Sequence, residues 1–349
     1  MIKEAIALVL DGRNLTPDLA RQAMKEIMEG QATPAQIAAL LAGMRMKGET
    51  VDEIAALAQE MRENSVRIRP TVEGRVVDTC GTGGDGLCTF NISTVSMFVA
   101  GGAGVRVAKH GNRSVSSKCG SADVLEFLGA RMDLRPDEVA RVMEKTGVCF
   151  MFAPVFHPGM KHALAPRREI GVRTVFNVLG PLTNPCDAKR HVLGVYDGSL
   201  TGKLAQVAAK LGLERVFVVH GEDGQDEIST TCATKVSELR DGSVKNYLLT
   251  PEDLGIKRAT LGDLKGGDVG TNARIMVNIL AGRCEGPKED AVAVNAAAAI
   301  VASGQACDLR EGLSRAYESI ESGSALRTLV EFLRANGNEG RVHGLLEGA

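Results

Sequence analysis

The stretch Val76-Val-Asp-Thr-Cys-Gly-Thr-Gly-Gly-Asp-Gly86 places four glycines within six residues, directly after a short β-branched run. Glycine adopts positive φ and lets a backbone approach a ligand closely, so its amide N–H groups can converge on an anion. An ordinary flexible turn does not need this many glycines beside an aspartate. The segment therefore predicts a strand that ends in a phosphate-binding loop.

Side chains that donate hydrogen bonds to phosphate follow this loop at short intervals. Asn91-Ile-Ser-Thr94 precedes an apolar segment, so Ser93 or Thr94 is expected to cap a helix whose N-terminus also attracts phosphate. Lys109 opens a polar run, residues 109–117, directly after a second predicted strand. Ligands of parallel sheets bind beyond the carboxyl ends of the strands. We therefore expect both polar segments to face one ligand.

Gly81-x-Gly83-x-x-Gly86 also satisfies the dinucleotide-binding fingerprint. That interpretation requires an acidic residue at the end of the next strand, where it holds a ribose diol. Here the next strand ends in Lys109-His110, which has the wrong charge. A Walker loop is excluded as well, because no Gly-Lys-Ser/Thr follows. A dedicated anion loop is the remaining interpretation.

Asp226 and Glu227 lie in an acidic loop after a predicted strand at residues 216–220. Mg²⁺ binds one or two carboxylates together with substrate phosphates and waters. On spacing alone a solvated acidic loop is an equal alternative, and a phosphate loop on the same sheet edge favours the metal site. His157 and Arg167, judged by themselves, are more often structural or solvated than functional.

The residue pattern changes near residue 70. Residues 1–65 carry apolar side chains at helical spacing, with Thr16, Thr33 and Thr50 at N-cap positions. Beyond residue 75, short β-branched runs alternate with helical segments, which is typical of a parallel sheet covered by helices. Asp241-Gly242 predicts a local hairpin. We therefore expect an α/β fold with a small helical domain, residues 1–70, and a larger α/β domain, residues 75–349, that has a mostly parallel central sheet.

Composition limits the partners that this chain can have. The 349 residues are 44% apolar and carry a formal net charge of −2. The overall charge therefore does not attract nucleic acid or an anionic membrane. The eight cysteines include no C-x-x-C pair, which favours reduced thiols. Residues 291–302 form an alanine-rich stretch too short to span a bilayer, and the first residues lack a signal-peptide pattern. We expect a cytoplasmic protein.

Several long strings, in the same order along most of the chain, closely resemble the anthranilate phosphoribosyltransferase family. They are residues 78–86, 91–94, 109–117, 120–123, 150–158, 173–185 and 219–228. The resemblance implies transfer of the 5-phosphoribosyl group from phosphoribosyl pyrophosphate to the amine of anthranilate, with release of pyrophosphate, in tryptophan biosynthesis. It also implies Mg²⁺, with two ions per subunit, and a homodimer formed through the helical domain. A segment near residues 167–185 is expected to complete that domain.

The resemblance also assigns roles to individual positions. Those implied to act directly in catalysis are Lys109, Arg167, Asp226 and Glu227, and those implied to hold magnesium are Ser93, Asp226 and Glu227. Contacts with anthranilate are implied for Gly81, His110, Asn112, His157, Arg167 and Pro181. Contacts with phosphoribosyl pyrophosphate are implied for Gly81, Gly84, Asp85, Thr89, Asn91, Ile92, Ser93, Thr94, Lys109, His110, Gly111, Asn112, Arg113, Ser114, Val115, Ser116, Ser117 and Ser121.

Two other functions stay open at this point. A pyrimidine nucleoside phosphorylase has a similar architecture, but paired carboxylates after Gly224 are not expected in it. A non-catalytic, nucleic-acid-binding relative should have a basic surface and lack metal ligands, whereas this chain is slightly acidic and keeps Asp226-Glu227.

Overall fold

A seven-stranded sheet forms the centre of the molecule, with strand order β3-β2-β1-β4-β5-β6-β7. The structure is a computed structural model that describes residues 1–114 and 118–347. The five neighbouring strands β3, β2, β1, β4 and β5 are parallel to one another. Strands β6 and β7 extend the sheet beyond β5 as antiparallel strands. The strands are β1 (Val76–Asp78), β2 (Arg106–Gly111), β3 (Val148–Phe152), β4 (Arg190–Gly194), β5 (Arg215–Gly221), β6 (Thr234–Arg240) and β7 (Ser243–Leu249).

The strand predicted before the glycine loop is β1, and the strand predicted at residues 216–220 is β5, which is longer by one residue at each end. The turn between β6 and β7 also forms as expected, with φ of 51° at Asp241 and 76° at Gly242. Positive φ at both central residues matches the right-handed twist of the two strands. The mostly parallel α/β fold is confirmed.

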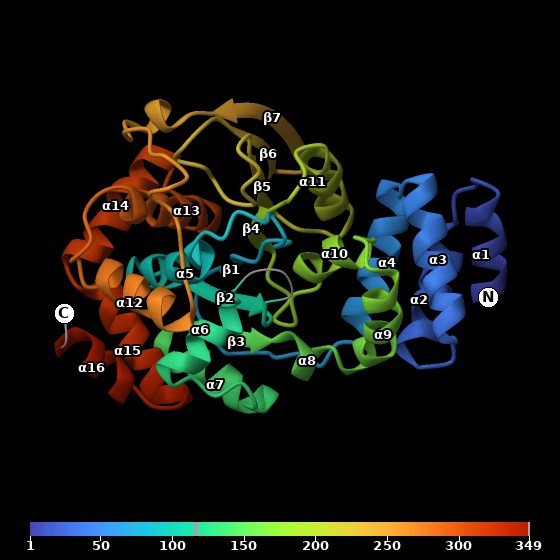
Figure 1. The fold of residues 1–349 in the computed structure, drawn as a ribbon, viewed down its shortest axis with the longest axis horizontal. Helices are drawn as coiled ribbons and strands as arrows, with labels where there is room; N and C mark the ends of the chain where they lie inside the picture. Colours follow the sequence, from blue (N-terminus) through green and yellow to red (C-terminus); the bar gives the residue numbers. More distant parts are fainter. Residues whose placement is uncertain (115–117, 348–349) are drawn as a thin grey trace.

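Four helices make up the N-terminal end of the molecule, at the right of Figure 1. They are α1 (Ile2–Leu10), α2 (Pro17–Met28), α3 (Pro34–Lys47) and α4 (Val51–Glu63). Thr16, Thr33 and Thr50 cap α2, α3 and α4, and the last two form full capping boxes. The capping pattern read from the sequence is therefore confirmed at all three helices.

A later part of the chain returns to this helical end. Helix α9 (Lys161–Ile170) packs on α2 and α3, and α10 (Phe176–Leu179) packs on α4 (Figure 1). Two short 3₁₀ segments, Pro158–Met160 and Gly180–Leu182, flank this pair of helices. The chain thus leaves the sheet after β3, contacts the helical bundle and returns to the sheet at β4.

The remaining helices surround the sheet. Helix α13 packs against β1, β4 and β5 and against α5, and α11 packs against β5 and β6 on the side that also contacts α4. The alanine-rich stretch is therefore a buried core helix. The helices of this part are α5 (Ile92–Gly102), α6 (Ser121–Leu128), α7 (Pro136–Thr146), α8 (Ala153–Phe156), α11 (Leu200–Lys210), α12 (Val269–Leu280), α13 (Pro287–Ser303), α14 (Leu309–Glu321), α15 (Ser324–Asn336) and α16 (Gly340–Glu347).

Buried apolar side chains form two clusters. One joins α5, α13 and α15 to the sheet, and it contains the edge-to-face pair Phe98 and Phe332. The other runs from α1–α4 through α10 into α11 and the adjacent faces of β4, β5 and β6. The helical bundle therefore shares its apolar core with part of the sheet. Within the described ranges, no helix is both long and apolar enough to cross a membrane.

Candidate active site

Three polar segments meet at the carboxyl ends of the parallel strands: the β1–α5 loop, the end of β2 and the β5–β6 loop. Side chains from all three come together around Ser93, the second residue of α5. Lys109 Nζ lies 3.3 Å from Ser93 Oγ, and the Ser93 N–H donates to Glu227 Oε1 at 3.2 Å. The expected convergence of separate sequence motifs on one edge of the sheet is therefore present.

Lys109 is the buried cation of this group, with only 2% of its surface exposed. Its Nζ donates to the Thr79 carbonyl as well as to Ser93. A buried ammonium is costly unless anionic or polar groups surround it. The charges of Asp226 and Glu227 act on the same region, so Lys109 is placed to balance anionic groups.

The Asp226 and Glu227 carboxyl groups lie close enough to Lys109 for its charge to lower their pKa values. Asp226 Oδ2 accepts a 2.7 Å hydrogen bond from the Gly83 N–H, which ties the β5–β6 loop to the glycine loop. Burial raises the pKa of both carboxyls, and the nearby charge of Asp85 adds to the shift at Asp226. The charge of Asp226 in turn raises the pKa of Glu227, whereas Lys109 opposes both shifts. Two buried carboxylates that repel each other favour a cation between them.

The donor set fits magnesium. Asp226, Glu227 and the Ser93 hydroxyl supply hard oxygen ligands, which Mg²⁺ prefers. No cluster of three or more His, Cys, Asp or Glu side chains with metal-site geometry occurs in the described part of the chain. A magnesium ion here would therefore complete its coordination with phosphate oxygens and water, as is usual for Mg²⁺.

The glycine loop has the backbone geometry expected of an anion cradle. Gly83, Gly84 and Gly86 have φ of 65°, 81° and 75°. At Gly81 a Cβ would lie 2.7 Å from Asp226 Oδ2, so only glycine lets the two loops approach. Asp85 Oδ1 accepts from the Leu87 N–H at 3.2 Å and so shapes the turn itself.

The start of α5 differs from the expectation. The N-cap residue is Asn91, and neither Ser93 nor Thr94 caps the helix. Helix α5 begins one residue before Ser93, which frees the Ser93 hydroxyl to face Lys109. The Asn91 side chain bonds the Cys119 carbonyl at 3.0 Å and Asn272 Nδ2 at 3.1 Å, and Ile92 and Thr94 are buried.

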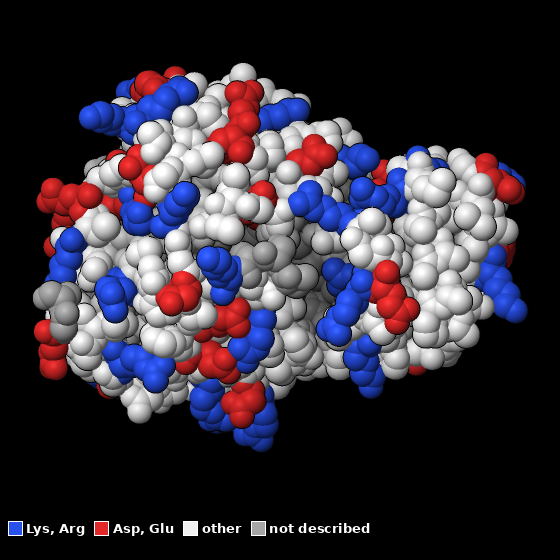
Figure 2. All heavy atoms as spheres, viewed as in Figure 1, with Lys and Arg blue, Asp and Glu red and all other residues white. Residues whose placement is uncertain are grey.

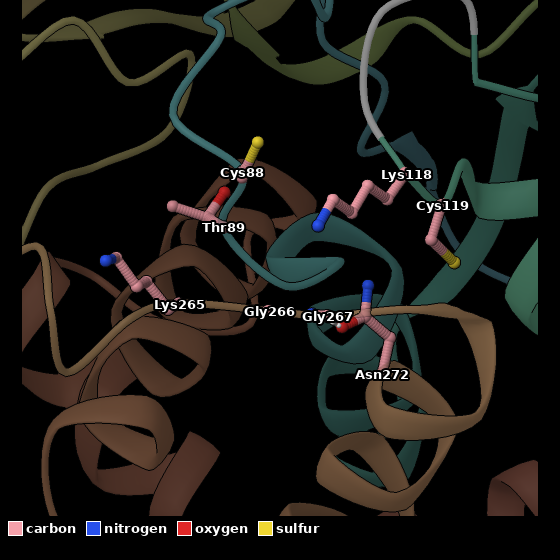
Figure 3. A pocket seen from close by; sticks show the side chains of 8 residues that line it. All are labelled: Cys88, Thr89, Lys118, Cys119, Lys265, Gly266, Gly267 and Asn272. Atoms are coloured by element: carbon pink, nitrogen blue, oxygen red, sulfur yellow. Dashed lines mark hydrogen bonds between the residues drawn. The ribbon is translucent and has the colours of Figure 1, made fainter.

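A pocket of about 250 Å³ lies beside the β1–α5 loop and is lined there by Cys88 and Thr89 (Figure 3). Lys118 extends across it toward Thr89, whereas Lys265 points away from it. Residues 88–90 pair with residues 264–266 along its edge through the Gly266 N–H to Cys88 carbonyl bond of 3.0 Å. The lining residues are Cys88, Thr89, Lys118, Cys119, Lys265, Gly266, Gly267 and Asn272.

The segment after β2 is partly engaged with α6. Arg113 makes ion pairs with Asp123 and Glu126 at 3.0 and 2.6 Å, so these carboxylates occupy its guanidinium. Ser121 is the first residue of α6, and its Oγ donates to the Asn112 carbonyl at 3.2 Å. Gly111 ends β2, and Ser114 donates its N–H to Asp123. The predicted contacts of Val115, Ser116 and Ser117 lie outside the described residues.

A second group of predicted residues includes His110 of β2 and His157, which follows α8. The rings of His110 and His157 are 5.0 Å apart, and both are buried. Neither Nε2 has a hydrogen-bond partner within the described residues. Burial lowers the pKa of both rings, to about 4 for His157, so both are neutral at pH 7. Pro181 is buried in the neighbouring 3₁₀ segment.

Arg167 occupies the last turn of α9, on the bundle side of the molecule. Its guanidinium lies 5.3 Å from the centre of the Phe176 ring, and burial lowers its pKa. Figure 2 shows a hollow between the bundle end and the larger body, with Lys and Arg side chains along its rim. An arginine that is largely desolvated and stacked on an aromatic ring is well suited to binding a carboxylate.

Known proteins share this arrangement over nearly the whole chain. The family model "Glycosyl transferase family, helical bundle domain" matches residues 3–65, and "Glycosyl transferase family, a/b domain" matches residues 73–326. The anthranilate phosphoribosyltransferase of Persephonella marina is 50% identical over 329 residues, covering 94% of this chain and 97% of the relative. That of Anaeromyxobacter sp. strain K is 53% identical over 336 residues, covering 96% and 98%. The chain belongs to the anthranilate phosphoribosyltransferase family.

Solved members of the anthranilate phosphoribosyltransferase family have the same fold. The crystal structure of the Thermus thermophilus enzyme has a TM-score of 0.90 and 42% identity, covering 95% of this chain and 98% of that one. The Saccharomyces cerevisiae enzyme in complex with phosphoribosyl pyrophosphate and Mg has a TM-score of 0.87 and 29% identity, covering 96% and 97%. The fold likeness thus extends to a member solved with its activated sugar.

Sequence reasoning did not single out Asp78 and Asn184, which bond to each other and to the backbone next to Lys109. Asp78 is fully buried, and its carboxylate accepts from Asn184 Nδ2 at 2.7 Å and from the His110 N–H at 3.3 Å. Asn184 also donates to the Ala108 carbonyl at 2.8 Å. Together they fix the backbone on both sides of Lys109. The signal was an ionisable residue at the end of an apolar strand, directly before the glycine loop.

Arg173 was also missed as an individual residue. It lies between α9 and α10, and its guanidinium donates to the Gly84 carbonyl while stacking 4.1 Å from the Tyr196 ring centre. Arg45 of α3 donates to the Arg173 carbonyl at 2.6 Å. No local pattern distinguishes Arg173 from a solvated arginine, because its partners are distant in sequence.

Proposed function

We propose that this chain transfers the 5-phosphoribosyl group of phosphoribosyl pyrophosphate to the amine of anthranilate, forming N-(5-phosphoribosyl)anthranilate and pyrophosphate in tryptophan biosynthesis. It is a pentosyltransferase of the glycosyltransferase class. The observation that carries the proposal is the group formed by Lys109, Ser93 and Glu227 at the sheet edge, in a chain half identical to curated members of the family.

The reaction explains why these residue types are gathered. As the bond from ribose C1 to pyrophosphate breaks, negative charge grows on the leaving group and positive charge on the sugar ring. Lys109 and the amides of the glycine loop are fixed donors that stabilise this growing negative charge more than the ground state. Because they are already in place, no reorganisation is needed during the reaction.

Magnesium, when bound, neutralises part of the phosphate charge as a Lewis acid. Asp226, Glu227 and Ser93 are the residues proposed to hold it, and we propose two ions per subunit. Both carboxyl groups are buried, and the charge of Asp226 raises the pKa of Glu227, which supports this assignment.

Anthranilate is proposed to approach from the bundle side. Arg167 would bind its carboxylate through charge-assisted hydrogen bonds, with Gly81 and Asn112 beside it and His110, His157 and Pro181 forming the access path. The amine is already a nucleophile, so orientation contributes more than a strong base. The neutral state of both imidazoles supports an apolar path for an aromatic ring.

The contacts implied for the activated sugar remain proposals at each position. The positive φ of the loop glycines and the exposure of Gly83 support backbone contacts with phosphate. Asn91 and Arg113 have protein partners, so we propose that they act on the sugar chiefly by ordering their segments.

We further propose a cytoplasmic homodimer that associates through the helical bundle. The eight cysteines, all free, support a reducing compartment. Leu10 of α1 and Met46 of α3 are 65% and 86% exposed on helices that pack together, which supports a partner at this face. The helical domain itself, residues 1–70 completed near residues 167–185, is likewise a proposal that the packing of α9 on α2 and α3 supports.

The deciding experiment follows the fluorescence of anthranilate after mixing with the protein, phosphoribosyl pyrophosphate and Mg²⁺. We expect a loss of fluorescence that requires all three additions. Thymidine with inorganic phosphate serves as the parallel reaction, and its turnover in place of anthranilate would support a pyrimidine nucleoside phosphorylase instead. A salt-dependent gel shift with DNA would support the nucleic-acid-binding alternative.

A further inference from the structure

The β5–β6 loop is held by side chains that lie outside the Asp226-Glu227 pair. On the upstream side, the Asp223 carboxylate accepts hydrogen bonds at both oxygens. Gln225 donates its backbone N–H to Oδ1 at 3.1 Å and its Nε2 to Oδ2 at 2.6 Å. Ser229 Oγ donates to the same Oδ2 at 2.8 Å, and Thr231 Oγ1 donates to it as well. One carboxylate thus gathers donors from both sides of the metal-binding pair.

The network continues to the next strand. Ser229 Oγ accepts from the N–H groups of Thr231 at 3.0 Å and Cys232 at 3.3 Å, and the Ser229 N–H donates to Thr234 Oγ1 at 2.9 Å. Thr234 is the first residue of β6. Burial raises the pKa of Asp223, but its hydrogen bonds have the larger combined effect and bring the pKa below its usual value. The carboxyl group therefore stays ionised at neutral pH.

Asn295 of α13 holds the downstream side. It is 2% exposed, and its Oδ1 accepts from the Ile228 N–H at 2.9 Å while its Nδ2 donates to the Ile228 carbonyl at 3.0 Å. Nδ2 also donates to the Ala291 carbonyl at 2.8 Å, which fixes the amide on its helix. Ile228 directly follows Glu227, so hydrogen bonds fix both the N–H and the carbonyl of the residue next to this carboxylate.

The loop has a physical need for this support. Asp226 and Glu227 are adjacent in sequence and both are buried, so they can bind one cation only if the loop backbone holds the two carboxyl groups in place. The loop also packs tightly against β4, because a Cβ on Gly194 would lie 1.5 Å from the Asp226 carbonyl oxygen. Outer partners that orient metal ligands commonly determine metal affinity.

We propose that Asp223 and Asn295 are positioning residues that hold Asp226 and Glu227 in their cation-binding arrangement before the cation arrives. The inference rests on the proposed function, because that function makes the pair a metal site. It assigns metal affinity to residues that touch neither the metal nor the substrates.

The test measures Mn²⁺ binding by electron paramagnetic resonance, with phosphoribosyl pyrophosphate present and anthranilate absent. Asp223→Asn places an amide donor against hydroxyl donors, so we expect the Mn²⁺ Kd to rise about 10- to 100-fold. Asp253→Asn is the matched control, since the Asp253 carboxylate also accepts from a backbone N–H and a hydroxyl, at Thr250, outside the β5–β6 loop. We expect it to bind Mn²⁺ as the wild type does.

Asn295→Asp removes the amide donors to the Ile228 and Ala291 carbonyls. If this buried substitution prevents folding, Ser229→Ala is the milder variant, because it removes only one hydroxyl donor to Asp223. Support requires weaker Mn²⁺ binding, an unchanged Tm of the metal-free protein in Asp223→Asn or Ser229→Ala, and turnover that recovers at high Mg²⁺. Wild-type affinity in these variants would overturn the inference. So would a loss that persists at high Mg²⁺ and follows a lower metal-free Tm. Absence of Mn²⁺ binding by the wild-type protein would instead overturn the metal site of the proposed function, and the inference with it.

Discussion

The Arg173 guanidinium donates to the Gly84 carbonyl and stacks 4.1 Å from the centre of the Tyr196 ring. One side chain therefore connects the segment between α9 and α10 to the glycine loop and to the residues after β4. Arg45 of α3 holds the backbone of Arg173 in turn, at 2.6 Å. The position of the glycine loop is thus coupled to the helical bundle.

Replacing Arg173 should loosen the glycine loop. Arg173→Ala removes a charged hydrogen bond and a stacking contact that are together worth about 1–2 kcal/mol in a partly exposed setting. We expect KM for phosphoribosyl pyrophosphate to rise about 5- to 30-fold, and steady-state kinetics with the sugar varied would measure it. Arg168→Ala, an exposed neighbour on α9, is the control and should leave KM unchanged. Equal kinetics for the two variants would contradict this role.

Arg167→Ala should separate the two substrates. A charge-assisted hydrogen bond to a carboxylate is worth roughly 1.5–3 kcal/mol, so we expect KM for anthranilate to rise at least tenfold while KM for the sugar changes little. Initial rates with each substrate varied in turn would measure both values. Parallel increases in the two KM values would remove Arg167 from the anthranilate site.

Lys109→Ala should impair the use of the phosphorylated donor. The variant removes a buried cation that faces Ser93 and the two carboxylates. We expect kcat/KM for phosphoribosyl pyrophosphate to fall about 100-fold or more, as when one preorganised electrostatic donor is lost. Lys145→Ala, which changes an exposed lysine of α7 three residues before β3 and hence at the amino end of the sheet, should leave these kinetics unaffected. Wild-type donor kinetics in Lys109→Ala would exclude the assigned role.

Glu53 should make the stability of the protein depend on acid pH. Its buried carboxylate accepts from the Leu15 N–H and the Thr50 N–H at 2.8 Å each and from Lys47 Nζ at 2.9 Å. Burial raises the pKa of Glu53, but these partners together lower it below its usual range. A depressed folded-state pKa contributes stability above the unfolded pKa, and this stability is lost as pH falls through the folded value.

Glu53→Gln should therefore cost about 3–5 kcal/mol of unfolding free energy at pH 7, as expected when one partner of a buried ion pair is removed. The difference from wild type should shrink below about pH 4.5. Urea unfolding at several pH values would measure it. Glu63→Gln breaks an exposed pair with Arg21 and should cost less than about 1 kcal/mol. A pH-independent difference for Glu53→Gln would show that the carboxylate charge is not responsible.

The sequence predicted the parts of the fold that depend on local signals. The hairpin predicted at Asp241-Gly242 joins β6 and β7 because both turn residues adopt positive φ. The helix caps at Thr33 and Thr50 form because a hydroxyl and a long polar side chain three residues apart satisfy the free N–H groups of the first turn. The convergence of the polar segments followed from the geometry of parallel strands.

Other features depend on contacts that no local pattern shows. Asn91, not Ser93 or Thr94, is the N-cap of α5, and its side chain bonds Asn272 and Cys119, far away in sequence, in place of the helix backbone. Arg173 donates to Gly84, 89 residues away, and Asn295 bonds Ile228, 67 residues away, so neither could be distinguished from an ordinary surface arginine or helix asparagine. Family resemblance supplied the proposed role of Arg167, which the residues alone did not.

The apolar side chains of α1–α4 belong to the same buried cluster as those of α11 and of one face of β4, β5 and β6. The bundle therefore lacks a separate hydrophobic core of its own. Removing it from the chain would expose apolar surface both on the bundle and on the remaining domain. Heat should melt the two regions together in a single calorimetric transition, in spite of their different architectures. Any opening between them has to be a slight tilt about this shared interior, since a wide separation would expose it to water.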